Sequence, residues 1–414
     1  MVNSQKVSIV NGQTSRSINR FSSINFEIIL LAYVVAFLIS PPIYVNNVQR
    51  LFVCCVCGIL LLLSIRKGIS ITNVISLYFI LITTVMFWNN NQLHKILLFI
   101  PIYILIFFIN IMEKTQKKGF ESFKVPFWIC LILFPLWNII TIIEFAKIPD
   151  IARLLAGSGA VDEAYYASRG IGGYGLVYSV VLIPALMIVL LKSKIVWKVH
   201  EKLLFVINLL SSFVLILMSG YFIATALMVA TLFFILIISP NIRTRFFQVF
   251  LGILIIALII IFLNNILDLL MEMLEGTMYF NKVNDIKESI NSGSSSGTME
   301  ARMVKYSQSI TTIVKHPILG DMSNIGGHSV ILDMLARFGL LAGVLFFYVY
   351  FKLISIYLEA NKYNRDGLYI ASIMFYITVF TFNTVSFTII PVICIIVPYV
   401  MTIVNYTEES YEIQ

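Results

Sequence analysis

The chain has 414 residues, of which 59% are hydrophobic and 12% charged, and its formal net charge is +8. So small a polar fraction excludes an ordinary soluble globular protein and predicts an all-α polytopic membrane protein. The Lys and Arg residues are spread over short segments between apolar runs, without a patch of interleaved aromatic residues, so the charge does not predict a nucleic-acid partner.

The first predicted segment is a polar tail, residues 1–25. The apolar segment that follows it is too long for a signal-peptide core. Apolar segments of about 20 residues, the length that crosses a bilayer, then predict a single integral domain at 26–404 and a short tail at 405–414. Twelve spans are predicted, at 26–45, 48–65, 69–88, 93–112, 125–145, 171–191, 203–219, 221–239, 247–267, 338–357, 368–385 and 388–404.

The basic residues of the short connections predict the orientation of these spans. With both tails in the cytoplasm, most Lys and Arg residues of the short loops fall on the cytoplasmic side, and only Arg50 and Lys95 lie near the short outer loops. Two long loops, 146–170 and 268–337, then lie on the outer face. We therefore expect a multi-pass protein of the cytoplasmic (inner) membrane with its reactive groups on the outer face.

The first long loop carries two arginines that each allow two interpretations. Arg153 lies in a short stretch, 151–156, that is typical of an amphipathic helix on the membrane surface, where it would meet lipid headgroups. Arg169 follows Tyr165 and Tyr166, an arrangement typical of an anchor at the membrane interface. A substrate phosphate is the alternative ligand for both arginines.

The second long loop is the main polar interruption of the chain, and ionisable groups of a membrane protein concentrate where water reaches them. A Ser-Gly link at 292–297 precedes a predicted helix that starts at Thr298 and stops at His316 and Pro317. Arg302 and Tyr306 would lie one to two turns into this helix. Arg302 is either a solvated helix-face charge or a ligand for phosphate, and His316 most simply ends the helix.

The run Gly326-Gly327-His328-Ser329 comes next and precedes a helical pattern from Val330 to Leu341. Ser329 is a suitable helix cap, which would leave His328 at the positive end of the helix dipole. That position disfavours imidazolium, so we expect a neutral His328 able to accept a proton near pH 7. An ordinary loop histidine is the alternative. Arg337 lies four residues after Asp333, which predicts an ion pair on the helix surface.

These residues resemble the O-antigen polymerase and O-antigen ligase superfamily of bacterial surface-polysaccharide assembly. The resemblance rests on His328-Ser329, the nine residues from Val330 to Phe338, and the turn that starts at Gly339 and contains Gly343. The Pro317-Ile-Leu-Gly320 run and Arg302 lie upstream, as in the family. Ala342 stands where the family pattern has Gly, and the first outer loop lacks the family's Arg-x-x-x-Leu.

The resemblance implies a metal-independent, inverting glycosyltransferase without a cofactor, acting on undecaprenyl-diphosphate-linked oligosaccharides as donor and acceptor. It implies that His328 deprotonates the acceptor hydroxyl, and that Arg302 and then Arg169 stabilise the diphosphate leaving group. Arg337, His316, Tyr306 and Arg153 are lower-ranked candidates for site residues. A chain-length regulator is a further possible partner.

Three functions fit the motif and the predicted topology. The first is a polymerase of repeat units for an O-antigen, capsule or exopolysaccharide, and the second is a ligase for the finished glycan. The third is a flippase of lipid-linked sugars, which the scarcity of ionisable residues near the span centres disfavours.

Overall fold

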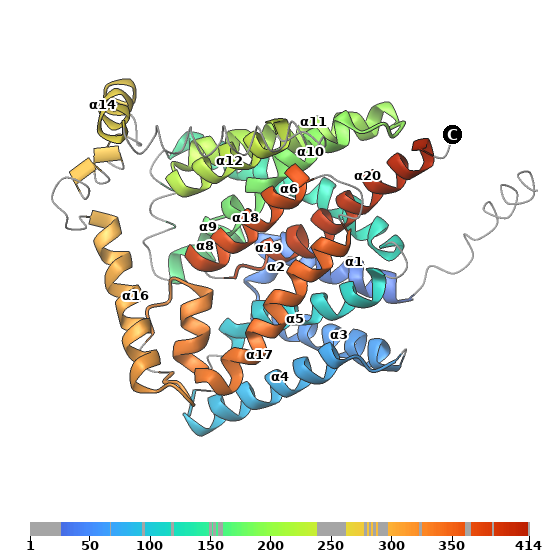
Figure 1. The fold of residues 1–414 in the computed structure, drawn as a ribbon, viewed down its shortest axis with the longest axis vertical. Coiled ribbons are helices and arrows are strands. Elements are labelled where there is room, and N and C mark those ends of the chain that lie inside the picture. Colours follow the sequence, from blue (N-terminus) through green and yellow to red (C-terminus); the bar gives the residue numbers. More distant parts are fainter. Residues whose placement is uncertain are drawn as a thin grey trace, which may run out of the picture.

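A computed structural model describes residues 26–66, 68–92, 96–116, 120–148, 151, 155, 160–237, 262–276, 280, 283–284, 287–288, 297–322, 325–360, 366–382 and 385–412. Every regular element in this part of the chain is helical (Figure 1). The first half contains α1 (Phe26–Ile39), α2 (Pro41–Tyr44), α3 (Asn47–Arg66), α4 (Ile71–Asn89), α5 (Ile96–Gln116), η3 (Glu121–Phe123), α6 (Lys124–Lys147), α8 (Ala160–Ser168), α9 (Tyr174–Ser179), η4 (Val180–Leu182) and α10 (Ile183–Lys192).

The second half contains α11 (Val199–Ser219), α12 (Phe222–Ile237), α14 (Leu263–Met273), α16 (Gly297–Lys315), α17 (Val330–Ala360), α18 (Asp366–Phe382), α19 (Ile389–Pro391), the π-helical η5 (Val392–Ile396) and α20 (Val397–Glu412). The structure therefore has the all-α architecture expected of an apolar helical membrane protein.

Among the described residues, six helical segments are long and apolar enough to cross a membrane: Ile71–Asn89, Phe99–Gln116, Glu121–Lys147, Tyr174–Lys192, Val199–Ser219 and Val330–Ala360. Shorter apolar helices occupy other predicted spans, among them Phe26–Ile39, Phe222–Leu236 and Ile389–Val404. The count of twelve spans stays a prediction. Most of the ninth predicted span, 247–267, lies outside the described residues, as do the predicted N-terminal tail and Arg153. Helix α14 runs across the predicted boundary between this span and the polar loop.

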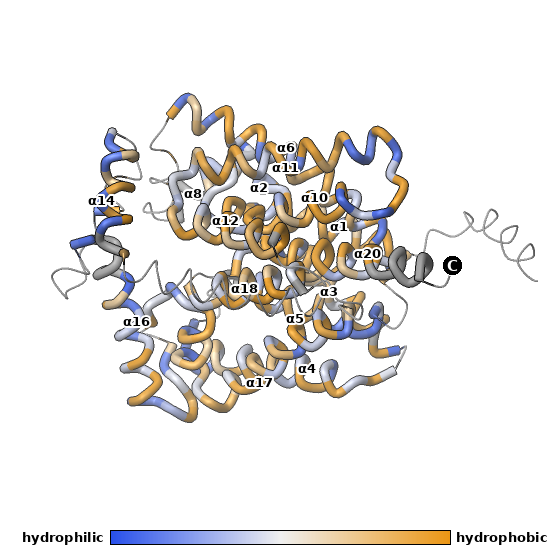
Figure 2. The backbone as a smooth tube through the Cα atoms, turned by 45° about the horizontal axis from the view of Figure 1, so that its top comes forward, coloured by the Kyte–Doolittle hydropathy of each residue, from blue (hydrophilic) through white to orange (hydrophobic). Residues whose placement is uncertain are grey.

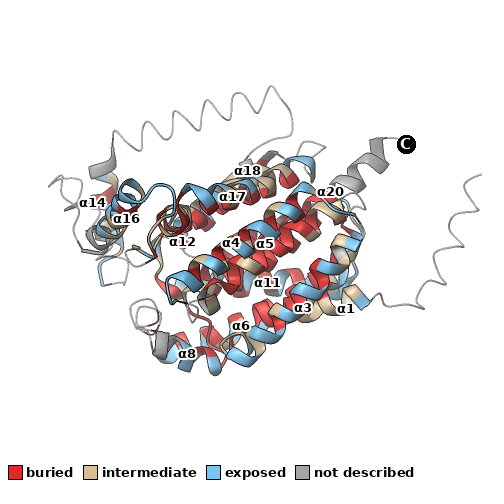
Figure 3. Ribbon diagram, turned by 90° about the horizontal axis from the view of Figure 1, so that it is seen from below, coloured by how far each residue is buried: buried red, intermediate tan, exposed pale blue. Residues whose placement is uncertain are grey.

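The bundle is held together by contacts between apolar helices. Helix α6 packs between α1 and α11, and α17 packs on α4, α5 and α18. The side chains in the interior are mostly aliphatic and aromatic, whereas the outward sides of the spans also carry exposed Leu, Ile, Val and Phe residues (Figures 2 and 3). Because exposed apolar side chains are stable against hydrocarbon and not against water, this surface is the one expected to face lipid.

Helix α17 is broken at Gly339, whose backbone (φ 58°, ψ −162°) is not helical. The break divides α17 into a short arm, residues 330–338, and a long arm, residues 340–360. A span starting at 338 and a separate helix continuing to Leu341 were predicted, so the first boundary is wrong by two residues and the second by three. The reason is that Gly339, with its positive φ, ends the first helical run and starts the second.

The turn after α16 supplies the hydrogen bonds that the break removes. The amides of Leu340 and Leu341 donate to the carbonyls of Pro317 (2.8 Å) and Ile318 (3.1 Å), and the Asp321 amide donates to the Ala336 carbonyl (2.8 Å). A Cβ on Gly320 would lie 2.5 Å from the Arg337 carbonyl, and one on Gly339 would lie 2.3 Å from the Ile318 carbonyl. Glycine at both positions is therefore required for the two backbones to meet.

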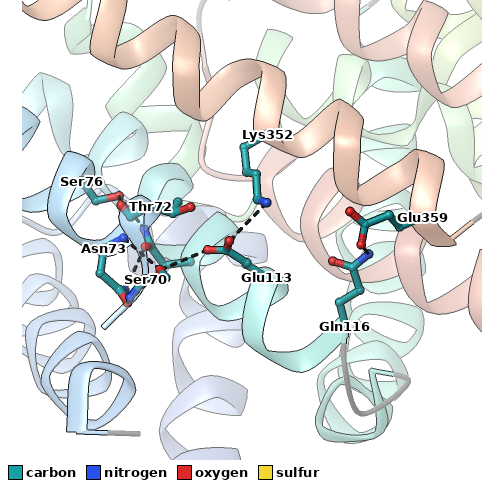
Figure 4. A network of polar contacts seen from close by, with 9 residues as sticks. Ser70, Thr72, Asn73, Ser76, Glu113, Gln116, Lys352 and Glu359 are labelled. Atoms are coloured by element: carbon teal, nitrogen blue, oxygen red, sulfur yellow. Dashed lines mark hydrogen bonds and ion pairs between the residues drawn. The ribbon is translucent and has the colours of Figure 1, made fainter. Parts of the chain in front are cut away.

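A polar cluster joins α4, α5 and α17, and we call it the Glu113 cluster (Figure 4). Glu113 forms an ion pair with Lys352 (3.2 Å) and accepts a hydrogen bond from the Ser70 hydroxyl (3.2 Å). The Asn73 amide donates to Asn110 (3.0 Å), whose own amide donates to the Ser76 hydroxyl (2.6 Å). These contacts provide partners for polar side chains that lie between apolar helices.

Candidate functional site

The loop that contains His328 is fastened to two helices through Asp333 and Ser309. The Asp333 carboxylate accepts hydrogen bonds from the Ser309 hydroxyl (2.8 Å) and from the amides of Gly327 (3.2 Å) and Ser329 (3.1 Å). The Ser309 hydroxyl in turn accepts from the Gly326 amide (3.0 Å). Three backbone amides of this loop are thus held by one buried carboxylate and one buried hydroxyl, which determines where His328 lies.

The two glycines of this loop serve different purposes. A Cβ on Gly326 would lie 2.1 Å from the Lys305 carbonyl oxygen, so the loop approaches α16 more closely than any other residue allows. Gly327 has open space around it but a φ of +74°, which favours glycine for conformational reasons. The Ser329 hydroxyl accepts from the Leu332 amide (3.4 Å), which confirms the predicted helix cap.

His328 is half-buried, and its pKa is lowered from the ordinary value of 6.5. Burial is the largest cause, the positive charges of Lys305 and Arg302 lower the pKa further, and the negative charge of Asp333 opposes them. The direction agrees with the predicted neutral imidazole. The main causes of the lowered pKa are desolvation and two cations, whereas the prediction rested on the helix dipole.

Arg302 lies beside a group of tyrosines from several elements. Its charge acts on the hydroxyls of Tyr174 and Tyr306. Tyr174 packs against Tyr178 and Tyr221, with ring centroids 4.5 and 5.2 Å away. Helix α16 therefore brings Arg302 to the ends of α9 and α12, a neighbourhood that the sequence order does not reveal.

Tyr306 has a buried hydroxyl that finds no hydrogen-bond partner among the described residues. Burial raises its pKa, and the Arg302 charge partly offsets that effect. A buried donor without a partner is unfavourable, and the charges of Arg302 and Asp333 act on this one. It is a suitable contact for a polar ligand that enters the site.

The other predicted site residues lie elsewhere. Arg169 is exposed, with its guanidinium 4.7 Å from the Tyr165 ring centroid, and no interaction of the described residues joins it to Arg302 or His328. This placement favours the interfacial-anchor interpretation. His316 is exposed directly after the last residue of α16, where the sequence predicted a helix end. Arg153 lies outside the described residues.

Arg337 does not form the predicted ion pair with Asp333. Within the described part of the chain the Asp333 carboxylate is engaged by Ser309 and the loop amides, while the Arg337 guanidinium lies 4.6 Å from the centroid of the Phe99 ring. Its Nε is buried and has no hydrogen-bond partner among the described residues. The i to i+4 spacing was a poor guide because the loop N-terminal to the helix uses the same carboxylate.

Two residues that organise the site were not singled out from the sequence. Asp333 was predicted only as an ion-pair partner of Arg337, although its place four residues after Ser329, in the first turn of a helix, is typical of a residue that binds preceding loop amides. Ser309 carries no comparable signal, because only the packing of α16 on the short arm of α17 brings it to Asp333.

The geometry combines a proton acceptor with positive charge. A neutral imidazole is a suitable general base near pH 7, and a guanidinium stabilises anionic oxygens such as those of a phosphate. No family model matches the chain, and neither the curated proteins nor the solved structures compared with it gave a match.

Proposed function

We propose that the protein is a membrane-embedded glycosyltransferase that polymerises lipid-diphosphate-linked oligosaccharide repeat units of a surface polysaccharide. The observation that carries the proposal is the juxtaposition of His328, with its lowered pKa, and the two cations Arg302 and Lys305 that contribute to that lowering. The motif around His328, which resembles the O-antigen polymerase and ligase superfamily, supports the same assignment.

In the proposed reaction, His328 takes the proton of an acceptor sugar hydroxyl as its oxygen attacks the anomeric carbon of the donor glycan. The bond from that carbon to the lipid diphosphate breaks, and the configuration of the carbon is inverted. Arg302 stabilises the negative charge that develops on the departing diphosphate. Asp333 and Ser309 hold the base in position, and the unpartnered Tyr306 hydroxyl contacts polar groups of the substrate.

The proposed location is the cytoplasmic membrane, with the site on the outer face. Arg169 has a smaller place in this scheme than its sequence suggested, because it lies on the Tyr165 ring. Arg302 and Lys305 provide the positive charge for the diphosphate leaving group.

The test uses the full chain reconstituted in liposomes with undecaprenyl-diphosphate-linked repeat units. His328→Ala should abolish the ladder of products while the protein still inserts, because it removes the proposed base. His316→Ala is the matched control, since His316 is exposed at the end of α16, and it should keep the ladder. An unchanged ladder in the His328 variant contradicts the base assignment.

The products of the wild-type protein separate the three functions. A ladder of increasing length supports polymerisation, and a single transfer of finished glycan to a non-repeat acceptor supports a ligase. Movement of lipid-linked sugar across the bilayer without a new glycosidic bond supports a flippase and excludes the glycosyltransferase proposal.

A further inference from the structure

Helix α16 lies across one end of the bundle instead of running along it. In Figures 1 and 3 it is found beside the ends of α4 and α12, and Figure 1 shows its axis crossing the direction of these spans. One side of α16 packs on the short arm of α17, through the buried Ser309 and Thr312. The helix is therefore fixed in place, and its remaining sides are available to the surroundings.

One of the remaining sides of α16 is apolar. Met303, Ile310 and Val314 have exposed fractions of 54%, 49% and 74%, and their spacing of seven and four residues aligns them in one stripe along the helix. Towards the C-terminal end of α16 the neighbouring flank carries the exposed Thr311 and Lys315. Nearer its start, Ser307 lies within the stripe, and Val304, 61% exposed, lies on that flank. A helix divided into an apolar stripe and a polar flank is typical of one that lies in a membrane interface (Figure 2).

The stripe continues into the turn after α16 and from there onto a membrane-spanning helix. Ile318 and Leu319 are 65% and 59% exposed, and the long arm of α17 continues with Leu340, Leu341 and Val344, at 55%, 40% and 52%. The hydrogen bonds from Leu340 to Pro317 and from Leu341 to Ile318 hold the two segments side by side. The apolar stripe of α16 is thus continuous with the lipid-facing side of a span.

The backbone of the turn is compatible with contact with lipid. The Gly320 amide donates to the His316 carbonyl (2.9 Å), and the Pro317 and Ile318 carbonyls accept from the long arm of α17. Backbone groups that face hydrocarbon must find partners within the protein, because no water is present to replace them. These three hydrogen bonds are of the kind that a turn in contact with hydrocarbon needs.

We propose that the C-terminal half of α16 and the Pro317–Gly320 turn lie in the boundary between headgroups and acyl chains of the adjacent leaflet. Ile310, Val314, Ile318 and Leu319 contact acyl chains, and Thr311 and Lys315 face the headgroups and water. This membrane contact is independent of the proposed enzymatic function. It holds Arg302 and His328 near the depth at which the phosphates of lipids lie.

The test places a photoreactive benzophenone amino acid at single positions of the full-length wild-type chain in liposomes. Residues Val314 and Ile318 represent the stripe, and Thr311 and Lys315 are matched controls on the polar flank less than one turn away. We expect phospholipid adducts by mass spectrometry from the two stripe positions and none from the two flank positions.

Three outcomes overturn the proposal. Adducts between two copies of the chain at Val314 and Ile318 would assign the stripe to a protein interface. Equal lipid adduct formation at stripe and flank positions would show that lipid does not select the apolar stripe. Lipid adducts at none of the four positions would place α16 in water above the membrane. Because the readout is the chemical identity of the adduct, it is independent of whether glycosyl transfer is observed.

Discussion

The Glu113 cluster and the candidate site are both groups of polar side chains in an apolar protein, but they differ in how their charges are partnered. In the Glu113 cluster the carboxylate pairs with Lys352 and accepts from Ser70. In the candidate site the described residues provide no ion pair or hydrogen bond for the side chains of Arg302, Lys305 and His328, and the Tyr306 hydroxyl is unpartnered. A closed cluster joins helices, whereas an open one is available to a ligand.

Helix α5 extends from the Glu113 cluster to the short arm of α17, which also carries Asp333. Phe99, near the start of α5, contacts Arg337, and Glu113 lies near the end of α5. Fourteen residues of helix separate them, a rise of about 21 Å. Substitutions in one group should therefore leave the other intact, and this independence is what the following experiments examine.

The largest effect is expected from the charge that faces the proposed leaving group. Arg302→Ala should lower the rate of glycosyl transfer by roughly two to three orders of magnitude, by analogy with the loss of an oxyanion donor. Arg302→Lys should retain part of the rate because charge remains but the planar fork is lost. Arg169→Ala is the control and should stay near the wild-type rate; a loss equal to that of Arg302→Ala would restore Arg169 to the site.

The next effect concerns Asp333, which acts through the loop it holds. Asp333→Asn should lower kcat by roughly tenfold to a hundredfold, because small displacements of a reacting group have effects of this order. Loss of its hydrogen bonds should also destabilise the fold by about 1–3 kcal/mol. A role in stability alone would reduce the amount of folded protein without changing kcat per folded molecule, so both are measured.

Glu113→Gln should change stability and not activity. Breaking a fully buried ion pair costs about 3–5 kcal/mol, and a smaller loss is expected here because the side chains of Glu113 and Lys352 are 22% and 24% exposed. The double variant Glu113→Gln with Lys352→Met should recover part of the melting temperature. A changed rate per folded molecule in Glu113→Gln would show that the two polar groups are coupled.

The smallest effect is a shift in pH dependence. The neutral imidazole is the active form of a base, so the rate should fall as pH drops through the pKa of His328, which lies below its ordinary 6.5. Lys305→Met removes a charge that lowers this pKa and should move the acid limb to higher pH. Asp333→Asn removes a charge that raises it and should move the limb to lower pH. Shifts in the same direction would contradict the electrostatic assignment.

Sequence reasoning located the site well where local rules apply. The start of α16 within one residue of Thr298, its end before His316 and Pro317, and the Ser329 cap all follow from capping and proline chemistry. The need for glycine at 326 and 327 is equally local, since close approach and positive φ are properties of a single residue. The ion pair between Arg337 and Asp333 was predicted wrongly because a loop outside the helix engages the Asp333 carboxylate.

Composition and periodicity alone determined that this protein is an assembly of apolar helices interrupted by one polar segment containing His328 and Arg302. Such features depend on residues close together in the chain. Only the tertiary structure decided that Asp333 and Ser309 hold the histidine loop, that burial is the main cause of the lowered His328 pKa, and that Arg302 lies beside Tyr174. These properties depend on which helices pack together, because hydrogen bonds and electrostatic fields act through space, irrespective of separation along the chain.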